Sequence, residues 1–415
     1  MFSLDHRAAI LLYLELLFAL ALLWREGLMK DARHRTAAVV FVSLAFVFRY
    51  CCLSYETLDY QDWIRVWLNS LRDNGAWKGL GQAIWSCNYN VPYLYILALI
   101  TKCSIYDLYL VKLTSILFDV LLAFFTMRLV GLFRESPARR LTAFIGILWL
   151  PTVFLNGALW GQCDVIYAAF AVLGVYLALA DRPGWSVAAV AVSISFKLQG
   201  IFLLPAYLAF FIGRKIKLRH FFVFPAAYIV TILPAVVAGR DFRELLTLYY
   251  HNTSTIGDGL NYNASSLYAL FDFSAMSGQA ASRIGILLAA FFCLSVYLWL
   301  FLRMEEINSR VLMGVCVLFC IGVPFLLPHM HDRYFFLADV LTFALAVIAP
   351  RTSPIPLLVS FGSLLGYHAY LKMRYLLPMR WGAAAMAFAL LLAILYTAVS
   401  FGGGKKVLTN DSDLV

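Results

Sequence analysis

The sequence predicts an all-α, polytopic membrane protein. Of its 415 residues, 63% are hydrophobic and only 13% are charged, whereas soluble globular proteins carry roughly 25% charged residues. Its mean hydropathy is +0.81. The apolar stretches are continuous, as at 8–24 and 284–303, while strands of a membrane barrel alternate apolar and polar residues. A continuous apolar segment satisfies its own backbone in lipid as a helix, so we expect a transmembrane helical bundle.

Segments of ~20 apolar residues are long enough to cross a bilayer, and the sequence contains about 13 candidate spans by that measure. They lie near 8–24, 37–52, 108–132, 141–155, 165–180, 186–197, 200–213, 220–238, 284–303, 311–327, 335–349, 355–371 and 381–400. The pair at 186–197 and 200–213 is short and fits either two spans or one broken or re-entrant element. We interpret residues 1–400 as a single integral membrane domain and 401–415 as a short cytoplasmic tail.

Basic residues in short loops predict the orientation, because Lys and Arg are retained on the cytoplasmic side. The loops at 25–35, 134–140, 214–219 and 303–310 are rich in Lys and Arg and share one side when the spans are counted. One short loop, with Lys372, Arg374 and Arg380, falls on the opposite side and disagrees. The net charge of +10 resides largely in such loops rather than on a basic face with stacking aromatics. The expected partner is therefore the lipid bilayer and not a nucleic acid.

This orientation leaves two long segments, 53–107 and 239–283, on the outer side. Long loops on a compact bundle usually carry function. The first segment contains an amphipathic pattern, which we interpret as an interfacial helix with aromatic residues at headgroup depth. Its apolar face is formed by Tyr60, Trp63, Ile64, Trp67, Leu68 and Leu71, and its polar face by Asp62, Arg65, Asn69 and Arg72.

Two polar motifs lie in the first long segment. Asp59 and Asp62 open it, and a carboxylate there would serve as a general base for an acceptor hydroxyl. The alternative for Asp59 is helix capping. The stretch 88–95, NYNVPYLY, offers the Asn90 amide and the Tyr93 hydroxyl for hydrogen bonds, or is only a turn followed by interfacial aromatics.

Two further motifs interrupt apolar stretches. In 156–167 the Trp160 ring can stack on a sugar face, and the side chains of Gln162 and Asp164 can bind hydroxyls, although Asp164 can equally cap a helix. Lys197 and Gln199 lie in FKLQGIFLLP. A Lys in an apolar run is costly without a partner, and that partner is either a lipid phosphate or a structural carboxylate.

The fifth motif is PHMHDRYFF at 328–336. His329 and His331 are too few to form a metal site by themselves, and none of the eight cysteines shows paired Cys-x-x-Cys spacing. Together with Arg333 the two histidines suit phosphate recognition, and a purely structural polar turn is the alternative. Within the span at 108–132, Lys112 and Asp119 lie seven residues apart on one face. We expect them to form a structural ion pair, with a proton relay as the alternative.

In this order the five motifs resemble the GT-C superfamily of polytopic glycosyltransferases, in particular the bacterial group related to the second mannosyltransferase of GPI-anchor biosynthesis. The resemblance covers roughly residues 37–350. The family opens its first outer loop with Gly-Asp-Tyr, then an aromatic residue and Pro-Trp; here Leu58 replaces the Gly and Val66 the Pro. The matching stretches are Asp59–Tyr60 with Trp63 and Trp67, Asn90–Tyr95, Gly161–Asp164, Lys197–Gln199 and Met330–Phe335.

The resemblance implies a GT-C type bundle whose active face is extracytoplasmic, in a bacterial plasma membrane. It implies transfer of a mannose-like hexose from a polyprenyl-phosphate donor to a glycan or glycolipid acceptor, with inversion. Asp59 would be the base, and Asp62 is a secondary candidate. Neither cofactor nor metal is implied, because side chains can neutralise a monophosphate. The residues implied in substrate or donor-phosphate binding are Arg333, His331, Lys197, Gln199, Asp164, Gln162, His329, Tyr93 and Asn90.

Two other classes of protein fit part of the pattern. A transporter, flippase or polysaccharide polymerase would also have many spans and intramembrane charges, but transporters usually show paired repeats and polar groups at the midplane. The sequence shows no convincing repeat. A non-catalytic scaffold for envelope assembly would not require the polar motifs.

Overall fold

The computed structural model describes residues 5–85, 87–254 and 259–402, and within them the chain is almost wholly helical. It divides into two compact units. Unit 1 comprises Met1–Leu177, Gly184–Gly200 and Arg219–Ile256, and unit 2 comprises Ala178–Pro183, Ile201–Leu218 and Gly257–Val415. The interpretation of 1–400 as one membrane domain stays a prediction. Apart from Phe401 and Gly402, the expected tail at 401–415 lies outside the described residues.

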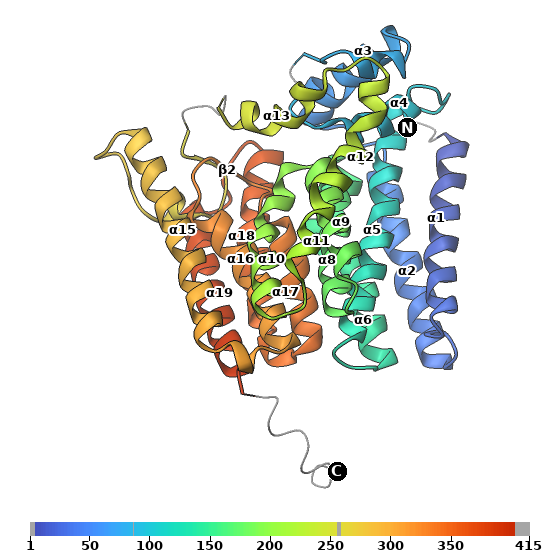
Figure 1. Ribbon diagram of the computed structural model, residues 1–415. Helices are drawn as coiled ribbons and strands as arrows, with labels where there is room; N and C mark the ends of the chain where they lie inside the picture. The colour runs from blue at the N-terminus through green and yellow to red at the C-terminus, as the bar shows by residue number, and fades with distance from the viewer. Residues whose placement is uncertain (1–4, 86, 255–258, 403–415) are drawn as a thin grey trace. The chain divides into compact units, whose positions relative to one another are not determined.

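Unit 1 consists mainly of helices that run side by side, with shorter helices at their ends (Figure 1). Helix α5 is the centre of this unit, since it contacts α1, α4, α6 and η3. Two of the short helices, η1 and η3, have π geometry, whereas η2 and η4 are 3₁₀ helices. The elements assigned mainly to unit 1 are α1 His6–Arg25, α2 Ala32–Cys52, η1 Tyr60–Ile64, α3 Arg65–Asp73, η2 Lys78–Gly81, α4 Val91–Ile100, α5 Asp107–Gly131, α6 Pro137–Trp149, α7 Pro151–Phe154, η3 Leu155–Trp160, α8 Asp164–Leu179, α9 Pro183–Phe196, α11 Leu218–Phe221, α12 Val223–Val237 and α13 Phe242–Ser254. The residues of η4 Leu198–Leu203 are divided equally between the two units.

Unit 2 is organised around α16, which contacts α10, α15, α17 and α19. A short parallel strand pair joins two distant segments, with Asn261 opposite Met330 and Tyr262 opposite His331. The elements of unit 2 are α10 Leu204–Ile212, β1 Asn261–Tyr262, α14 Leu267–Leu270, α15 Gly278–Leu302, η5 Met304–Glu306, α16 Ser309–Leu326, β2 Met330–His331, α17 Phe336–Ile348, η6 Pro350–Thr352, α18 Pro354–Leu371 and α19 Met379–Ser400.

The structure confirms an α-helical membrane protein. Among the described residues, seven helices are long and apolar enough to cross a bilayer, and an eighth crossing is possible if the bent pair Pro137–Trp149 and Pro151–Trp160 forms one span. Every predicted span coincides largely with helical residues, but five of the apolar helices have only 10–17 residues. The figure of about 13 spans therefore stays a prediction.

The bend of 45° between α6 and α7 has a local cause. Pro151 lacks the N–H that would continue the α6 hydrogen-bond ladder, and its ring disfavours a helical conformation at Leu150. Leu150 accordingly has ψ 120°, and a new helix starts at Pro151. This break directs the following π-helix η3 away from the α6 axis.

The amphipathic pattern at 60–71 corresponds to η1 and α3. Its predicted apolar face is buried at Tyr60, Ile64, Trp67, Leu68 and Leu71, whereas Trp63 is exposed. The position of this helix relative to a membrane surface stays a prediction. In the second long segment, α15 begins at Gly278, inside the range 239–283 assigned to a loop.

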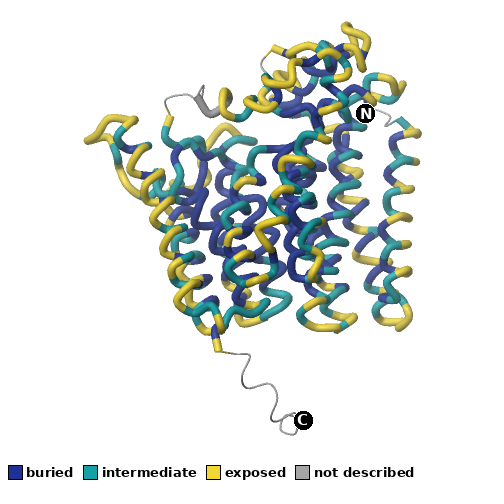
Figure 2. Tube along the Cα trace, in the orientation of Figure 1, coloured by how far each residue is buried: buried dark blue, intermediate teal, exposed yellow. Residues whose placement is uncertain are grey.

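Burial distinguishes the central helix of unit 1 from its neighbours. Figure 2 shows α5 buried along much of its length, while α1 carries exposed residues over much of its surface. The exposed residues of α1 include Ile10, Leu14 and Leu17, which suits a helix in contact with lipid. The polar residues buried along α5 therefore face protein.

Candidate functional site

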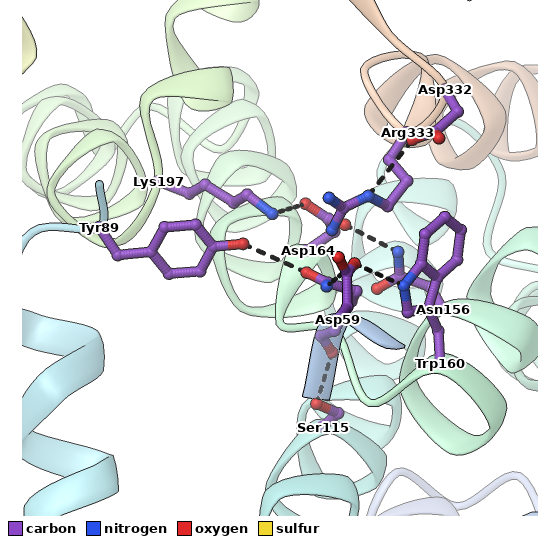
Figure 3. Close-up of polar contacts among 10 residues, drawn as sticks. Asp59, Tyr89, Ser115, Asn156, Trp160, Asp164, Lys197, Asp332 and Arg333 are labelled. Carbon is purple, nitrogen blue, oxygen red and sulfur yellow. Dashed lines mark hydrogen bonds and ion pairs between the residues drawn. The ribbon is translucent and has the colours of Figure 1, made fainter. Parts of the chain in front are cut away.

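Asp59 lies after α2, at the start of the first long segment. Its backbone is helical, with φ −57° and ψ −38°, and its side chain makes no capping hydrogen bond. The carboxylate is 7% exposed. Its Oδ2 accepts two hydrogen bonds, from Trp160 Nε1 at 2.7 Å and from Gln162 Nε2 at 2.7 Å (Figure 3). Thr57 Oγ1 donates to the Trp160 carbonyl at 2.9 Å, so two side chains join this segment to the end of η3.

The turn after η3 presents both of these donors. The π-helix ends at Trp160, and Gly161 has φ 80°, a left-handed conformation that glycine adopts without the Cβ penalty. Trp160 is fully buried, and its indole N–H is bound to Asp59. The expectation that Trp160 stacks on a sugar is therefore wrong, since its ring has no accessible face. It orients the carboxylate instead.

Asp164 and Lys197 form a buried ion pair. Lys197 Nζ lies 2.5 Å from Asp164 Oδ1, with the two side chains 5% and 1% exposed. Asn156 Nδ2 donates to the other oxygen, Oδ2, at 2.7 Å. Asp164 is the first residue of α8, where the helix dipole favours a carboxylate. Of the two partners expected for Lys197, the structure shows the carboxylate.

Tyr89 connects the ion pair with Gln162. Its hydroxyl donates to Gln162 Oε1 at 3.2 Å, which directs the amide nitrogen of Gln162 toward Asp59. The Lys197 ammonium lies 4.9 Å from the centre of the Tyr89 ring, a cation–π distance. The same ring packs against Trp67 at 5.2 Å and Tyr93 at 5.4 Å between centroids. Tyr89 is thus at the centre of the cluster.

Four other predicted residues belong to unit 1, and each has different surroundings. Asn90 is buried, caps α4 and donates to Tyr228 Oη at 2.8 Å. Tyr93 is buried, and burial raises the pKa of its hydroxyl well above the usual value. Gln199 is half-buried, and its Oε1 has no hydrogen-bond partner within the described part of the chain. Asp62 is exposed on η1, so the structure does not join it to the network of Asp59.

His329, His331 and Arg333 belong to unit 2. His329 has φ 62°, and both ring nitrogens are engaged: Nδ1 with the Gly259 carbonyl at 2.7 Å and Nε2 with Ser282 Oγ at 3.1 Å. Since Nδ1 must donate to a carbonyl, Nε2 accepts in the neutral ring. These contacts indicate that His329 fixes a turn.

His331 and Arg333 have different surroundings. The His331 ring stacks on Tyr262 at 4.6 Å, with 12° between the planes, and lies 5.2 Å from Tyr334. Arg333 Nε lies 3.4 Å from Asp332 Oδ1, and the Arg333 side chain is 16% exposed (Figure 3). The parallel pairing of β1 with β2 fixes the backbone at His331, and Arg333 follows two residues later.

The expected ion pair between Lys112 and Asp119 is wrong. Asp119 Oδ2 accepts instead from Arg49 Nε at 3.0 Å and Nη2 at 2.9 Å, with both side chains fully buried. Lys112 Nζ donates to the Cys52 and Tyr55 carbonyls at 2.7 and 2.5 Å. Residues seven apart on a helix are separated by about 10 Å along its axis, which is too far for a direct contact here.

Several residues of the site were not predicted individually. Tyr89 lay within the motif 88–95, but nothing in the sequence distinguished it from its neighbours. Ser115 also belongs to the site, because its hydroxyl donates to the main-chain carbonyl of Gln162 at 2.7 Å. Asn156 and Ser115 are common polar residues in apolar surroundings, and their roles depend on contacts with distant segments. In the described residues no group of three or more His, Cys, Asp or Glu side chains is arranged to hold a metal ion.

Comparison with protein families adds an independent finding. Residues 88–324 match the sequence model of glycosyltransferase family 87, and this range is more than half of the 415-residue chain. It includes Asn90, Gln162, Asp164 and Lys197, while Asp59 and Arg333 lie outside it. None of the curated proteins compared with the chain matches it.

Proposed function

Because the chain belongs to glycosyltransferase family 87, we propose that it transfers a mannose-like hexose from a polyprenyl-phosphate-linked donor to a lipid-linked or cell-surface glycan acceptor. The observation that carries this proposal is the buried Asp59 carboxylate held by two N–H donors. A fixed, buried carboxylate at the start of a long segment suits a general base. The resemblance of the five motifs to GT-C enzymes supports the same assignment.

In the proposed reaction the acceptor hydroxyl attacks the anomeric carbon of the donor sugar. Asp59 takes the hydroxyl proton while the new C–O bond forms, and the bond to the lipid phosphate breaks. A single displacement of this kind inverts the anomeric configuration. The two hydrogen bonds to Oδ2 fix the plane of the carboxylate, so that little reorganisation is needed during proton transfer.

The departing phosphate needs positive charge. We assign this role first to Arg333, because a guanidinium binds phosphate with two parallel hydrogen bonds, and second to His331. Lys197 is the third choice, since Asp164 already neutralises its ammonium. The proposal keeps Gln162, Asn90, Tyr93 and Gln199 as candidates near the substrates and needs neither a cofactor nor a metal. Asp164 and His329 stay candidates on the same footing, because Gln162 and Asn90 are likewise held by hydrogen bonds within the chain.

We place the active face on the extracytoplasmic side of a bacterial plasma membrane, following the distribution of Lys and Arg in the short loops. The partners are then the polyprenyl-phosphate donor, a glycan or glycolipid acceptor, and the bilayer itself. A comparison of lipid-linked glycans by mass spectrometry, with and without the active protein, would identify the missing sugar and the acceptor together.

The direct test is to replace Asp59 with Asn in the purified, reconstituted protein and to measure hexose transfer from a polyprenyl-phosphate donor. A general base typically contributes 10²–10⁴-fold, so we expect kcat to fall by about that factor. Asp62→Asn, three residues along the same helix and exposed, is the matched control and should cause a much smaller loss. Full activity of Asp59→Asn would refute the base assignment, and transport of substrate without any donor would favour a transporter.

A further inference from the structure

Three polar residues form a buried row on one face of α5. Lys112, Ser115 and Asp119 are 0%, 2% and 0% exposed. Their hydrogen bonds do not join them to one another. Lys112 and Asp119 reach α2 and the turn that follows it, and Ser115 reaches the turn after η3. A row of polar groups in the centre of an apolar helix is costly in a membrane protein, so its partners indicate its role.

Lys112 binds the segment of the chain that precedes Asp59. Its ammonium donates to the carbonyls of Cys52, the last residue of α2, and Tyr55, which lies four residues before Asp59. The last carbonyls of a helix lack intrahelical donors and carry a partial negative charge, so a cation fits this position. The stem of Lys112 also lies beside Gly161: a Cβ there would stand 3.7 Å from Lys112 Cε.

Ser115 binds the segment that carries Gln162, the residue that donates a hydrogen bond to Asp59. Its hydroxyl donates to the main-chain carbonyl of Gln162 at 2.7 Å, and the side chain of Gln162 donates to Asp59 at 2.7 Å. Ser115 also packs closely on η3, because a Cβ at Gly157 would stand 3.2 Å from Ser115 Cβ. Neighbouring turns of α5 therefore hold both partners, Asp59 from one segment and Gln162 from another, 103 residues apart.

We propose that Lys112 and Ser115 are positioning residues of the transfer reaction: they hold the two segments of unit 1 so that Gln162 keeps Asp59 oriented. The proposal rests on the assignment of Asp59 as the base. Neither residue touches substrate in this scheme, and both act through Asp59. Small misplacements of a catalytic group lower the rate strongly without weakening binding.

The test compares Lys112→Met and Ser115→Ala with controls from the same region. Thr126→Val is the control for Ser115→Ala, because Thr126 is buried in α5 and donates to Leu122 of its own helix. Lys102→Met, at an exposed position before α5, is the control for the lost charge. We expect kcat to fall roughly tenfold in Ser115→Ala and roughly 10–100-fold in Lys112→Met, while KM for the donor changes less than about twofold. The controls should retain wild-type kcat, and Lys112→Arg should recover most of the loss.

A second measurement separates positioning from general support of the fold. If Ser115 acts through Asp59, Ser115→Ala should cause no further loss in an Asp59→Asn background, because residues that act as a unit are not additive. An additive loss, or a raised KM with unchanged kcat, would overturn the proposal. If Lys112→Met fails to fold, Ser115→Ala carries the test alone.

The two hypotheses can fail separately. Wild-type kcat in both Ser115→Ala and Lys112→Met, with Asp59→Asn inactive, refutes the positioning role and leaves the proposed base intact. An active Asp59→Asn variant refutes the base itself, whatever the α5 variants do.

Discussion

Replacing Asp164 with Asn should destabilise the protein more than replacing its partner Lys197 with Met. In the first variant the buried Lys197 side chain loses its counterion, with the face of Tyr89 and a neutral amide beside it. In the second variant the Asp164 carboxylate keeps the hydrogen bond from Asn156 and the favourable dipole at the start of α8. The asymmetry follows from the surroundings of the two charges, not from the pair itself.

The magnitude can be worked out from the contact. At 2.5 Å the Coulomb attraction is about 7 kcal/mol with an effective dielectric constant near 20, and most of it offsets the cost of removing both charges from water. Removing one partner of a buried pair costs roughly 3–5 kcal/mol, and we expect Asp164→Asn in this range. The hydrogen bond and helix dipole that Asp164 keeps should reduce the cost of Lys197→Met to roughly 2–3 kcal/mol. The double variant buries no charge and should be more stable than Asp164→Asn alone.

The assay is thermal unfolding in detergent at a fixed scan rate, followed by tryptophan fluorescence, with wild type and all three variants in parallel. Asp164→Asn should lower the midpoint by about 5 °C or more. The double variant should recover part of that loss. Equal midpoints for the two single variants, or a double variant whose loss equals the sum of the single losses, would show that the buried charge is not what determines the cost.

Three further predictions concern single contacts. Tyr89→Phe keeps the ring but removes the donor to Gln162, and should lower kcat roughly 2–10-fold in the transfer assay, with little change in KM. Gln162→Glu turns a donor into an acceptor at the proposed base and should lower kcat roughly 10–100-fold; unchanged kcat would contradict the orienting role. The third contact is at Gly366 in unit 2, where an added Cβ would stand 2.6 Å from the Asn263 carbonyl oxygen. An added Cβ at Gly184, in unit 1, would have no neighbour within 4 Å. Gly366→Ala should therefore cost roughly 1–3 kcal/mol of stability, measured by thermal unfolding, and Gly184→Ala should be the milder change.

The helices were predictable because apolar residues in lipid leave the backbone few alternatives. Segments such as 108–132 and 284–303 correspond to the single helices α5 and α15. The number of membrane crossings was not predictable, because it depends on whether short helices such as α9 and α10 pass through the bilayer. The bend at Pro151 was also missed, since 141–155 was interpreted as one span.

The motifs also predicted some of the residues that the structure brings together. Gln162, Asp164 and Lys197 stood out as polar residues in apolar surroundings, and the structure joins Gln162 to Asp59 and Asp164 to Lys197. Their partners could not be inferred, because Gln162 and Asp59 are 103 residues apart and spacing along the chain carries no information on such a contact.

The pairing of charges within α5 shows the same limit. Lys112 and Asp119 share a helix face, which suggested an ion pair, yet their partners come from α2 and the turn that follows it. Arg49 would have been the better candidate for Asp119, as a cation near the end of a predicted span. The packing of helices against one another decides which partner a buried charge meets. No pattern in the sequence shows that packing.

The two π-helices, η1 after Asp59 and η3 before Gly161, make the site sensitive to how the chain is wound. A π-turn accommodates one residue more than the α-helix would hold, and such turns are frequent at functional sites. If Leu155–Trp160 rewound as a regular α-helix with its length unchanged, its end would rotate by about 100°, carrying the Trp160 indole away from the carboxylate. Deleting one residue from the same segment would remove the extra residue of the π-turn and leave Trp160 nearly in phase. Hydropathy and composition are the same for both windings, so neither would show whether a family member keeps the donor that orients its base.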